Sequence, residues 1–517
     1  MAPPRSATDT KILPIVVGLA FAFTITVVDP LVLNLNLPQV SRALHVPPHL
    51  IGLLGGTATL VMAAAVLAAG NLGDAFGLER LLTLGLIVVT VADLLSFFSP
   101  GFGFLLAMRA LAGLGMAALL GGPLALLKTS VPESRRAAAI GMLMGVEMVL
   151  CGVTPALTGW VVTTAGWRFL FLLTPLLAAV SLVLTVRYVP EAARTERRRL
   201  DVGGISLFGM TLTTLVIGLA AAQNGITRPQ TWLTLAISAT AALLFVRHER
   251  RAREPALDLA LFRSSGFCLA LTAALTLNLL AAGLGFVLGQ FGSTVLALSP
   301  EAIGLLYLPG TLLIAGAVVF AGRVVGKTTP WPVMVAGLLL LAASGFVLAA
   351  TASPTMALWL LVAVVWLGNL GSLVTSVSVS EAVLAEAPPG HSGTVASTQL
   401  AFGMIGCAFG PTVYLLLFQF FFRQAWSADA EARGMAVTRA EQAVDAVRSG
   451  MALSPGTTYD PNLLRQTSGL ELGLDVAGGL RLTMSTVSVL PLVVAMVTCL
   501  LPLRRSRRDR RPSPPRV

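Results

Sequence analysis

Apolar segments long enough to cross a membrane recur along this chain from Ile12 to the region of Leu501. About 20 helical residues span the roughly 30 Å of hydrocarbon in a bilayer, and we count about fourteen such segments. They are continuously apolar, whereas the strands of a membrane barrel are about ten residues long and alternate in polarity. Because 56% of the residues are apolar and only 11% are charged, the sequence predicts an all-α integral membrane protein.

Lysine and arginine are distributed unevenly between the two sides of this predicted bundle. With the N-terminus inside, 25 of the 35 lie in cytoplasmic loops and tails, 9 lie on the opposite side, and Arg109 lies within an apolar segment. The positive-inside rule then predicts a multi-pass protein of the cell's inner (cytoplasmic) membrane with both termini cytoplasmic. The basic residues are dispersed and lack interleaved aromatics, so we expect the net charge of +11 to reflect topology, and nucleic-acid binding is the weaker interpretation.

Two charged stretches, Arg187–Asp201 and Arg247–Asp258, divide the sequence. They bracket a pair of predicted helices over about 204–222 and 231–246, with six helices before and six after, which is the repeat plan of transporters that bind near the bilayer midplane. The pattern predicts four parts: an N-terminal six-helix bundle (1–190), cytoplasmic linkers with two inserted helices (191–258), a C-terminal six-helix bundle (259–503) with an irregular extracellular loop (423–480), and a basic cytoplasmic tail (504–517).

Four ionisable residues fall inside the apolar segments: Asp29, Asp93, Arg109 and Glu147. A carboxylate at membrane depth costs at least about 2.5 kcal/mol, so such groups are candidates for an ion, proton or substrate path. At 1.5 Å per residue, the first three lie roughly 9 to 14 Å inside the outer leaflet and could meet. Glu147 falls near the midplane, where an unpaired carboxylate favours its neutral form.

Each of these residues also has a purely structural interpretation. Asp29 could cap a helix that breaks at Pro30, Arg109 could be the structural partner of a buried acid, Glu147 could hydrogen-bond across helices, and Asp93 could face an outer vestibule.

Glycine and proline occur at positions that could bend or tighten the backbone in two further segments. The turn between the second and third helices reads Gly70-Asn-Leu-Gly-Asp74-Ala-Phe-Gly77-Leu-Glu-Arg80, in which small residues allow close approach and an Asp beside an Arg can latch two helices. The fifth helix contains Pro155 and Gly159, which allow it to bend. We expect a gating role for these six positions: Gly70, Asp74, Gly77, Arg80, Pro155 and Gly159.

Together these features resemble the major facilitator superfamily, and in detail its fourteen-helix drug:proton antiporter branch. The resemblance rests on four stretches in order: the run Asp29 to Pro38 with Asn34 five residues after the Asp, the turn Gly70 to Arg80, Trp167-Arg-Phe-Leu-Phe171, and Pro255 to Arg263. It implies the major facilitator fold, two six-helix bundles plus the inserted hairpin. From their burial and depth, and for Asp29 also from the match to the branch, we hypothesise that Asp29, Arg109, Glu147 and Asp93 couple protons to substrate.

The expected function is therefore proton-coupled efflux of hydrophobic drugs or toxic compounds, with cations as one candidate class, across the cytoplasmic membrane. Alternatives are a dedicated exporter of one natural product or lipid, an importer, and, from a different class, a membrane-embedded enzyme or a non-transporting sensor. The expected partners are a small-molecule substrate, protons and the lipid bilayer, with the chain as a monomer. Candidate polar groups of the cavity are Asn34, Asn278 and Gln290.

No nucleotide-binding loop or nucleophile constellation supports an enzyme. The four cysteines lie in four different apolar segments without paired spacing, so we expect neither a disulfide nor a metal site. No cofactor is expected, because a proton gradient can supply the energy.

Overall fold

The computed structural model describes residues 9–46, 51–189, 201–223, 229–252, 257, 259–294, 310–353, 355–387, 391–432 and 472–509. Within these ranges all regular structure is helical, and 13 helices are long and apolar enough to cross a membrane. A further helix, α12 (Thr311–Lys327), has 17 described residues and lies between the ninth and tenth of them. This architecture agrees with the predicted all-α bundle of about fourteen helices.

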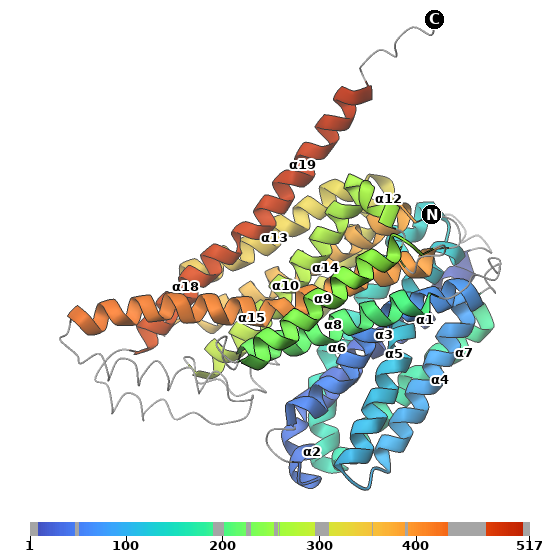
Figure 1. Ribbon diagram of the computed structural model, residues 1–517, viewed down its shortest axis with the longest axis horizontal. Coiled ribbons are helices and arrows are strands. Elements are labelled where there is room, and N and C mark those ends of the chain that lie inside the picture. The colour runs from blue at the N-terminus through green and yellow to red at the C-terminus, as the bar shows by residue number, and fades with distance from the viewer. Residues whose placement is uncertain are drawn as a thin grey trace, which may run out of the picture.

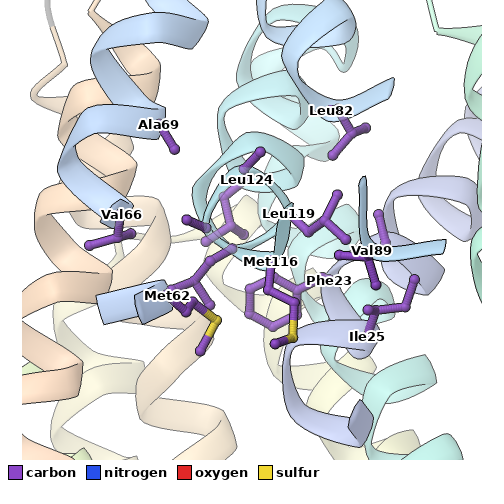
Figure 2. Close-up of a cluster of buried hydrophobic side chains, with 14 of the residues drawn as sticks. Phe23, Ile25, Met62, Val66, Ala69, Leu82, Val89, Met116, Leu119 and Leu124 are labelled. Atoms are coloured by element: carbon purple, nitrogen blue, oxygen red, sulfur yellow. The ribbon is translucent and has the colours of Figure 1, made fainter. Parts of the chain in front are cut away.

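The first six crossing segments pack into one bundle around a shared apolar core. Figure 2 shows part of this core, where Phe23, Met62, Val89 and Met116 come from four different helices. The members are α1 (Asp9–Leu35), α3 (Ile51–Phe76), α4 (Leu78–Phe97), α5 (Phe102–Ser130), α6 (Glu133–Thr164) and α7 (Leu173–Tyr188), with α2 (Leu37–Ala43) after α1 and the short 3-10 helix η2 (Trp167–Leu172) before α7.

A second apolar core lies in the C-terminal part of the chain and includes Phe267, Met334, Leu361 and Tyr414. Its helices are η3 (Leu259–Arg263), α10 (Ser265–Thr294), α13 (Pro330–Thr351), α14 (Leu358–Ala385), α15 (Ser392–Ala432), α18 (Leu472–Val487) and α19 (Val489–Asp509). Helix α12 packs against α6, and its Ile314 and Val318 belong to the first core.

The prediction of an irregular loop over 423–480 is wrong at both ends, where the structure has helix. Helix α15 continues to Ala432 and α18 begins at Leu472. The alanine-rich run that follows Trp426 favours helix, so an existing helix extends through it although it is polar. The middle of this loop lies outside the described residues.

The inserted hairpin consists of α8 (Val202–Gln223) and α9 (Pro229–Glu249). Helix α8 packs against α3 of the first bundle and α15 of the second, as Figure 1 shows. A Cβ on Gly209 would lie 2.8 Å from the carbonyl oxygen of Ala64 in α3, and the Thr412 hydroxyl in α15 donates to the carbonyl of Leu219 at 3.3 Å. The hairpin therefore touches both bundles.

The helix boundaries follow local backbone chemistry. Gly77 and Gly166 are the two glycines with positive φ among the described residues, at 106° and 98°, and they separate α3 from α4 and α6 from η2. Pro132 directly precedes α6, where a missing amide hydrogen costs least. Side chains at the two glycines would be strained whatever space surrounds them.

The two bundles meet at one end and diverge toward the other (Figure 1). We call the meeting end the basic end, because the helix ends there carry Arg80, Lys128, Arg136 and Lys327. α1 begins and α19 ends toward this end, while α2 lies at the opposite end (Figure 1). Close backbone approach joins the bundles there: a Cβ on Gly141 of α6 would lie 2.8 Å from the carbonyl oxygen of Val318 in α12.

Candidate functional site

A buried ion cluster joins α1, α4 and α5 through Arg109. Its Nη1 donates to both carboxylate oxygens of Asp29 at 2.9 Å, and its Nη2 donates to Oδ1 of Asp93. Helix α1 runs through Pro30 to Leu35 without a break, so Asp29 does not cap a broken helix. The structure thus brings together the three residues whose depths in the sequence coincide.

The cluster is sealed from solvent and contains more negative than positive groups. Arg109 and Asp93 are fully buried, and Asp29 is 3% exposed. Two carboxylates share one guanidinium, which never loses its proton in proteins. Oδ2 of Asp93 and Nε of Arg109 have no hydrogen-bond partner among the described residues. An unpaired charge in such surroundings is costly.

Three neighbours complete the surroundings of the guanidinium. Ser96 accepts a second hydrogen bond from Nη2 at 3.3 Å, and the Phe171 ring of η2 lies 5.0 Å from Cζ of Arg109. Thr174, on the first turn of α7, approaches Oδ1 of Asp29 at 3.5 Å. The planar cation is therefore held by hydrogen bonds at its edge and by an aromatic ring on its face.

The other candidate polar residues lie apart from this cluster. Glu147, in the middle of α6, is partly exposed, and the structure shows no hydrogen bond or ion pair to it among the described residues. Asn34 is exposed and lies against Gly55 of α3. Asn278 donates to the carbonyl of Ala274 at 2.8 Å within α10, while the side chain of Gln290 lies outside the described ones.

Asp74 of the glycine-rich turn reaches across to the other bundle. Its carboxylate accepts hydrogen bonds from the backbone amides of Gly393 and Thr394 and from the Thr394 hydroxyl, each at 2.8 Å. These groups form the first turn of α15, where the helix dipole favours a negative charge. Gly70 makes room, because a Cβ there would lie 2.8 Å from the carbonyl oxygen of Gly393. Arg80 is exposed in the first turn of α4.

A second contact between the bundles was not predicted from the sequence. Arg136 at the start of α6 binds Glu381 near the end of α14, with Nε to Oε2 at 2.9 Å and Nη2 to Oε1 at 2.5 Å. Beside it, Nζ of Lys128 donates to the carbonyl of Ala387 at 2.6 Å. We call the Asp74, Arg136 and Lys128 contacts together the latch at the basic end.

Helix α6, in which a bend at Pro155 and Gly159 was predicted, is continuous through both residues. The helix runs from Glu133 to Thr164 through Pro155, whose side chain lies outside the described ones. A Cβ on Gly159 would meet nothing within 4 Å, so Gly159 is not needed for close packing in this conformation. Among the described residues no group of three or more His, Cys, Asp or Glu is placed to hold a metal ion.

We expect Arg136→Gln to loosen the latch. Loss of one partner leaves Glu381 largely buried without its cation, which costs about 3–5 kcal/mol when burial is complete and less here, since both side chains retain some exposure. The measurement is the accessibility to a thiol reagent of a cysteine introduced at Gly326, in α12 beside Ser134. Labelling should accelerate in Arg136→Gln, and the exchanged pair Arg136→Glu with Glu381→Arg should restore a slow rate. Equal labelling in all three proteins would show that the pair does not hold the bundles together.

Comparison with known proteins assigns this geometry to a family. The sequence profile of the Major Facilitator Superfamily matches residues 15–411. The multidrug resistance protein Stp of Mycobacterium tuberculosis is 30% identical over 315 residues, which are 60% of this chain and 59% of Stp. The multidrug efflux pump LfrA of Mycolicibacterium smegmatis is 27% identical and matches over 81% of this chain and 84% of LfrA. The methylenomycin A resistance protein of Streptomyces coelicolor is 27% identical, over 76% and 83%.

Solved structures share the fold at low sequence identity. The human organic anion transporter MFSD10 superposes with a TM-score of 0.60 at 16% identity, over 96% of this chain and 100% of that one. The proton:xylose symporter XylE superposes with a TM-score of 0.57 at 12% identity, over 86% and 95%. At these identities the likeness shows the architecture alone.

Proposed function

The chain belongs to the major facilitator superfamily, and from that premise we propose that it is a proton-coupled efflux transporter that exports hydrophobic compounds, cations among them, across the cytoplasmic membrane. The relatives named as multidrug resistance and efflux proteins support export rather than import. The proposed role is transport and not catalysis, and it needs no cofactor.

The observation that carries the proposal is the charge imbalance of the Asp29–Arg109–Asp93 cluster. Its two carboxylates can bind one proton, and they then match the single guanidinium charge for charge. Without that proton the cluster carries a net negative charge, which attracts a lipophilic cation or holds Arg109 more tightly. Alternation between these two states couples proton entry to cargo release.

The latch supports a direction for the cycle. We identify the basic end with the cytoplasm through the positive-inside rule. The structure is then closed toward the cytoplasm, and the bundles diverge toward the outside, which is the side from which protons enter. Each 100 mV of membrane potential supplies about 2.3 kcal/mol per proton, equivalent to roughly 50-fold accumulation.

Glu147 is a separate contributor in this proposal. It lies within α6 without a partner among the described residues, so it is available to a cationic cargo or to a second proton. Its contribution can be distinguished by comparing cargoes, because transport of a neutral compound would not need a carboxylate there.

The test uses purified protein in liposomes with ethidium as the cation. An imposed inward proton gradient should drive ethidium against its concentration gradient, and a protonophore should abolish this movement. Glu147→Gln should lower transport of ethidium more than transport of a neutral dye of similar size. Uphill transport that survives the protonophore would overturn proton coupling.

A second candidate is a dedicated exporter of one compound. The similarity to a methylenomycin A resistance protein favours it. A susceptibility panel in an efflux-deficient host separates the two proposals, because protection against chemically unrelated compounds supports the multidrug function and protection against one supports the dedicated exporter.

A further inference from the structure

The inserted hairpin carries an apolar cavity that lies away from the ion cluster. Its volume is about 250 Å³, and it lies between Leu207 and Met210 of α8 and five residues of α9, namely Ala236, Ile237, Thr240, Ala241 and Leu244. Ala236, Thr240 and Leu244 are exposed, and α9 is the least buried of the 13 crossing helices. In a bilayer this cavity opens onto lipid rather than onto the rest of the protein.

The cavity face of α9 continues into exposed arginines. Ala236, Thr240 and Leu244 are spaced four residues apart and share one face of the helix, and Arg247 and Arg251 follow on that face three and seven residues later. The backbone amides of Arg251 and Ala252 both donate to the carbonyl of His248 at 2.9 Å, so helical geometry persists beyond Glu249. Arg247 and Arg251 are both exposed.

Among the described residues at this end of the hairpin, the other ionisable groups except Arg250 are paired or buried. Nε2 of His248 lies 2.7 Å from Oδ1 of Asp201, and the same oxygen accepts from the amide of Gly204 at 2.9 Å. Glu249 is 4% exposed. Arg250 is also exposed, so the surface that the described residues present to the membrane interface here is positive.

We propose that the hairpin binds an anionic phospholipid from the leaflet at the basic end, with one acyl chain in the cavity and the phosphate on Arg247 and Arg251. An apolar cavity in hydrocarbon does not distinguish between lipids, because their tails are equally apolar. Selectivity therefore comes from the headgroup: the guanidinium fork matches a phosphate in two places, and arginines near the surface attract anionic lipid.

The experiment is native mass spectrometry of the delipidated full-length protein. It is titrated with dioleoylphosphatidylglycerol and, in parallel, with dioleoylphosphatidylcholine. We expect tighter binding of phosphatidylglycerol. Arg247→Gln with Arg251→Gln should weaken it on the order of 30-fold, which corresponds to about 1 kcal/mol for each arginine. Ala236→Phe, which fills the cavity, should weaken both lipids.

Two matched variants serve as controls. Arg323→Gln with Lys327→Gln removes two exposed charges at the same end and at the same spacing, and Ala239→Phe adds the same ring to an exposed position of α9 that does not line the cavity. Both should bind phosphatidylglycerol as the unchanged protein does.

The proposal is overturned if the two arginine-to-glutamine changes weaken binding no more than the α12 control, or if phosphatidylcholine binds as tightly as phosphatidylglycerol. A two-chain mass that disappears in Ala236→Phe would assign the cavity to a second copy of the chain and would equally overturn it.

Discussion

Replacing Arg109 with alanine should destabilise the protein by about 3–5 kcal/mol, because it removes the guanidinium that two buried carboxylates share. The measurement is thermal unfolding of the purified protein in detergent. We also expect loss of the phenylalanine contact and of the hydrogen bond to Ser96 to add to the effect.

The control for this prediction is Arg168→Ala. Arg168 also lies over an aromatic ring, with Cζ 4.6 Å from the Trp167 ring centroid, but it is exposed and should contribute at most about 1 kcal/mol. A triple variant, Arg109→Gln with Asp29→Asn and Asp93→Asn, should recover most of the lost stability, since no buried charge remains. An Arg109→Ala protein as stable as the unchanged chain would mean that the cluster is not charged in the way its geometry indicates.

Replacing Asp29 with asparagine should lower gradient-driven export at least tenfold while leaving the fold intact. Arg109 keeps Asp93 as its partner in this variant, so unfolding should shift far less than in Arg109→Ala. The cluster, however, can no longer alternate between one and two negative charges. In liposomes we expect at least a tenfold lower rate of uphill ethidium transport, on the order of 1.4 kcal/mol or more in coupling.

Two measurements distinguish a coupling role for Asp29 from a structural one. Exchange of labelled for unlabelled ethidium without a proton gradient should persist in Asp29→Asn, because cargo binding and bundle movement remain. Asp201→Asn, which removes a carboxylate at the hairpin, should transport normally. Uphill transport by Asp29→Asn at the unchanged rate would exclude Asp29 from proton coupling.

The sequence predicted much of the architecture because the bilayer restricts the choices. Segment length, continuous apolarity and the loop charges were enough to place the bundles and the hairpin, and the helices expected over 204–222 and 231–246 lie within the observed α8 and α9. Boundaries were predicted less well where helix extends into water. The polar extension of α15 to Ala432 depends on helix propagation, which hydropathy does not measure.

Those residues of the candidate site whose depth in the membrane could be estimated from the sequence were predicted to lie together. Asp29, Asp93 and Arg109 stand at similar depths in neighbouring helices, so their meeting followed from the rise per residue. Arg136 and Glu381 gave no such signal. They are 245 positions apart in sequence, each stands near the end of a helix, and charged residues there usually face solvent. Only the packing of one bundle on the other brings them together.

Helix α8 has a kinetic consequence for any alternating-access cycle. It lies against α3 and α15, which belong to different bundles and are held together by the contacts of Asp74. Movement that parts α3 from α15 must strip α8 from one of them and later restore the contact. The height of the barrier between the two conformations therefore depends partly on α8, which lies outside the Asp29–Arg109–Asp93 cluster, and a substitution at Gly209 should change the turnover rate.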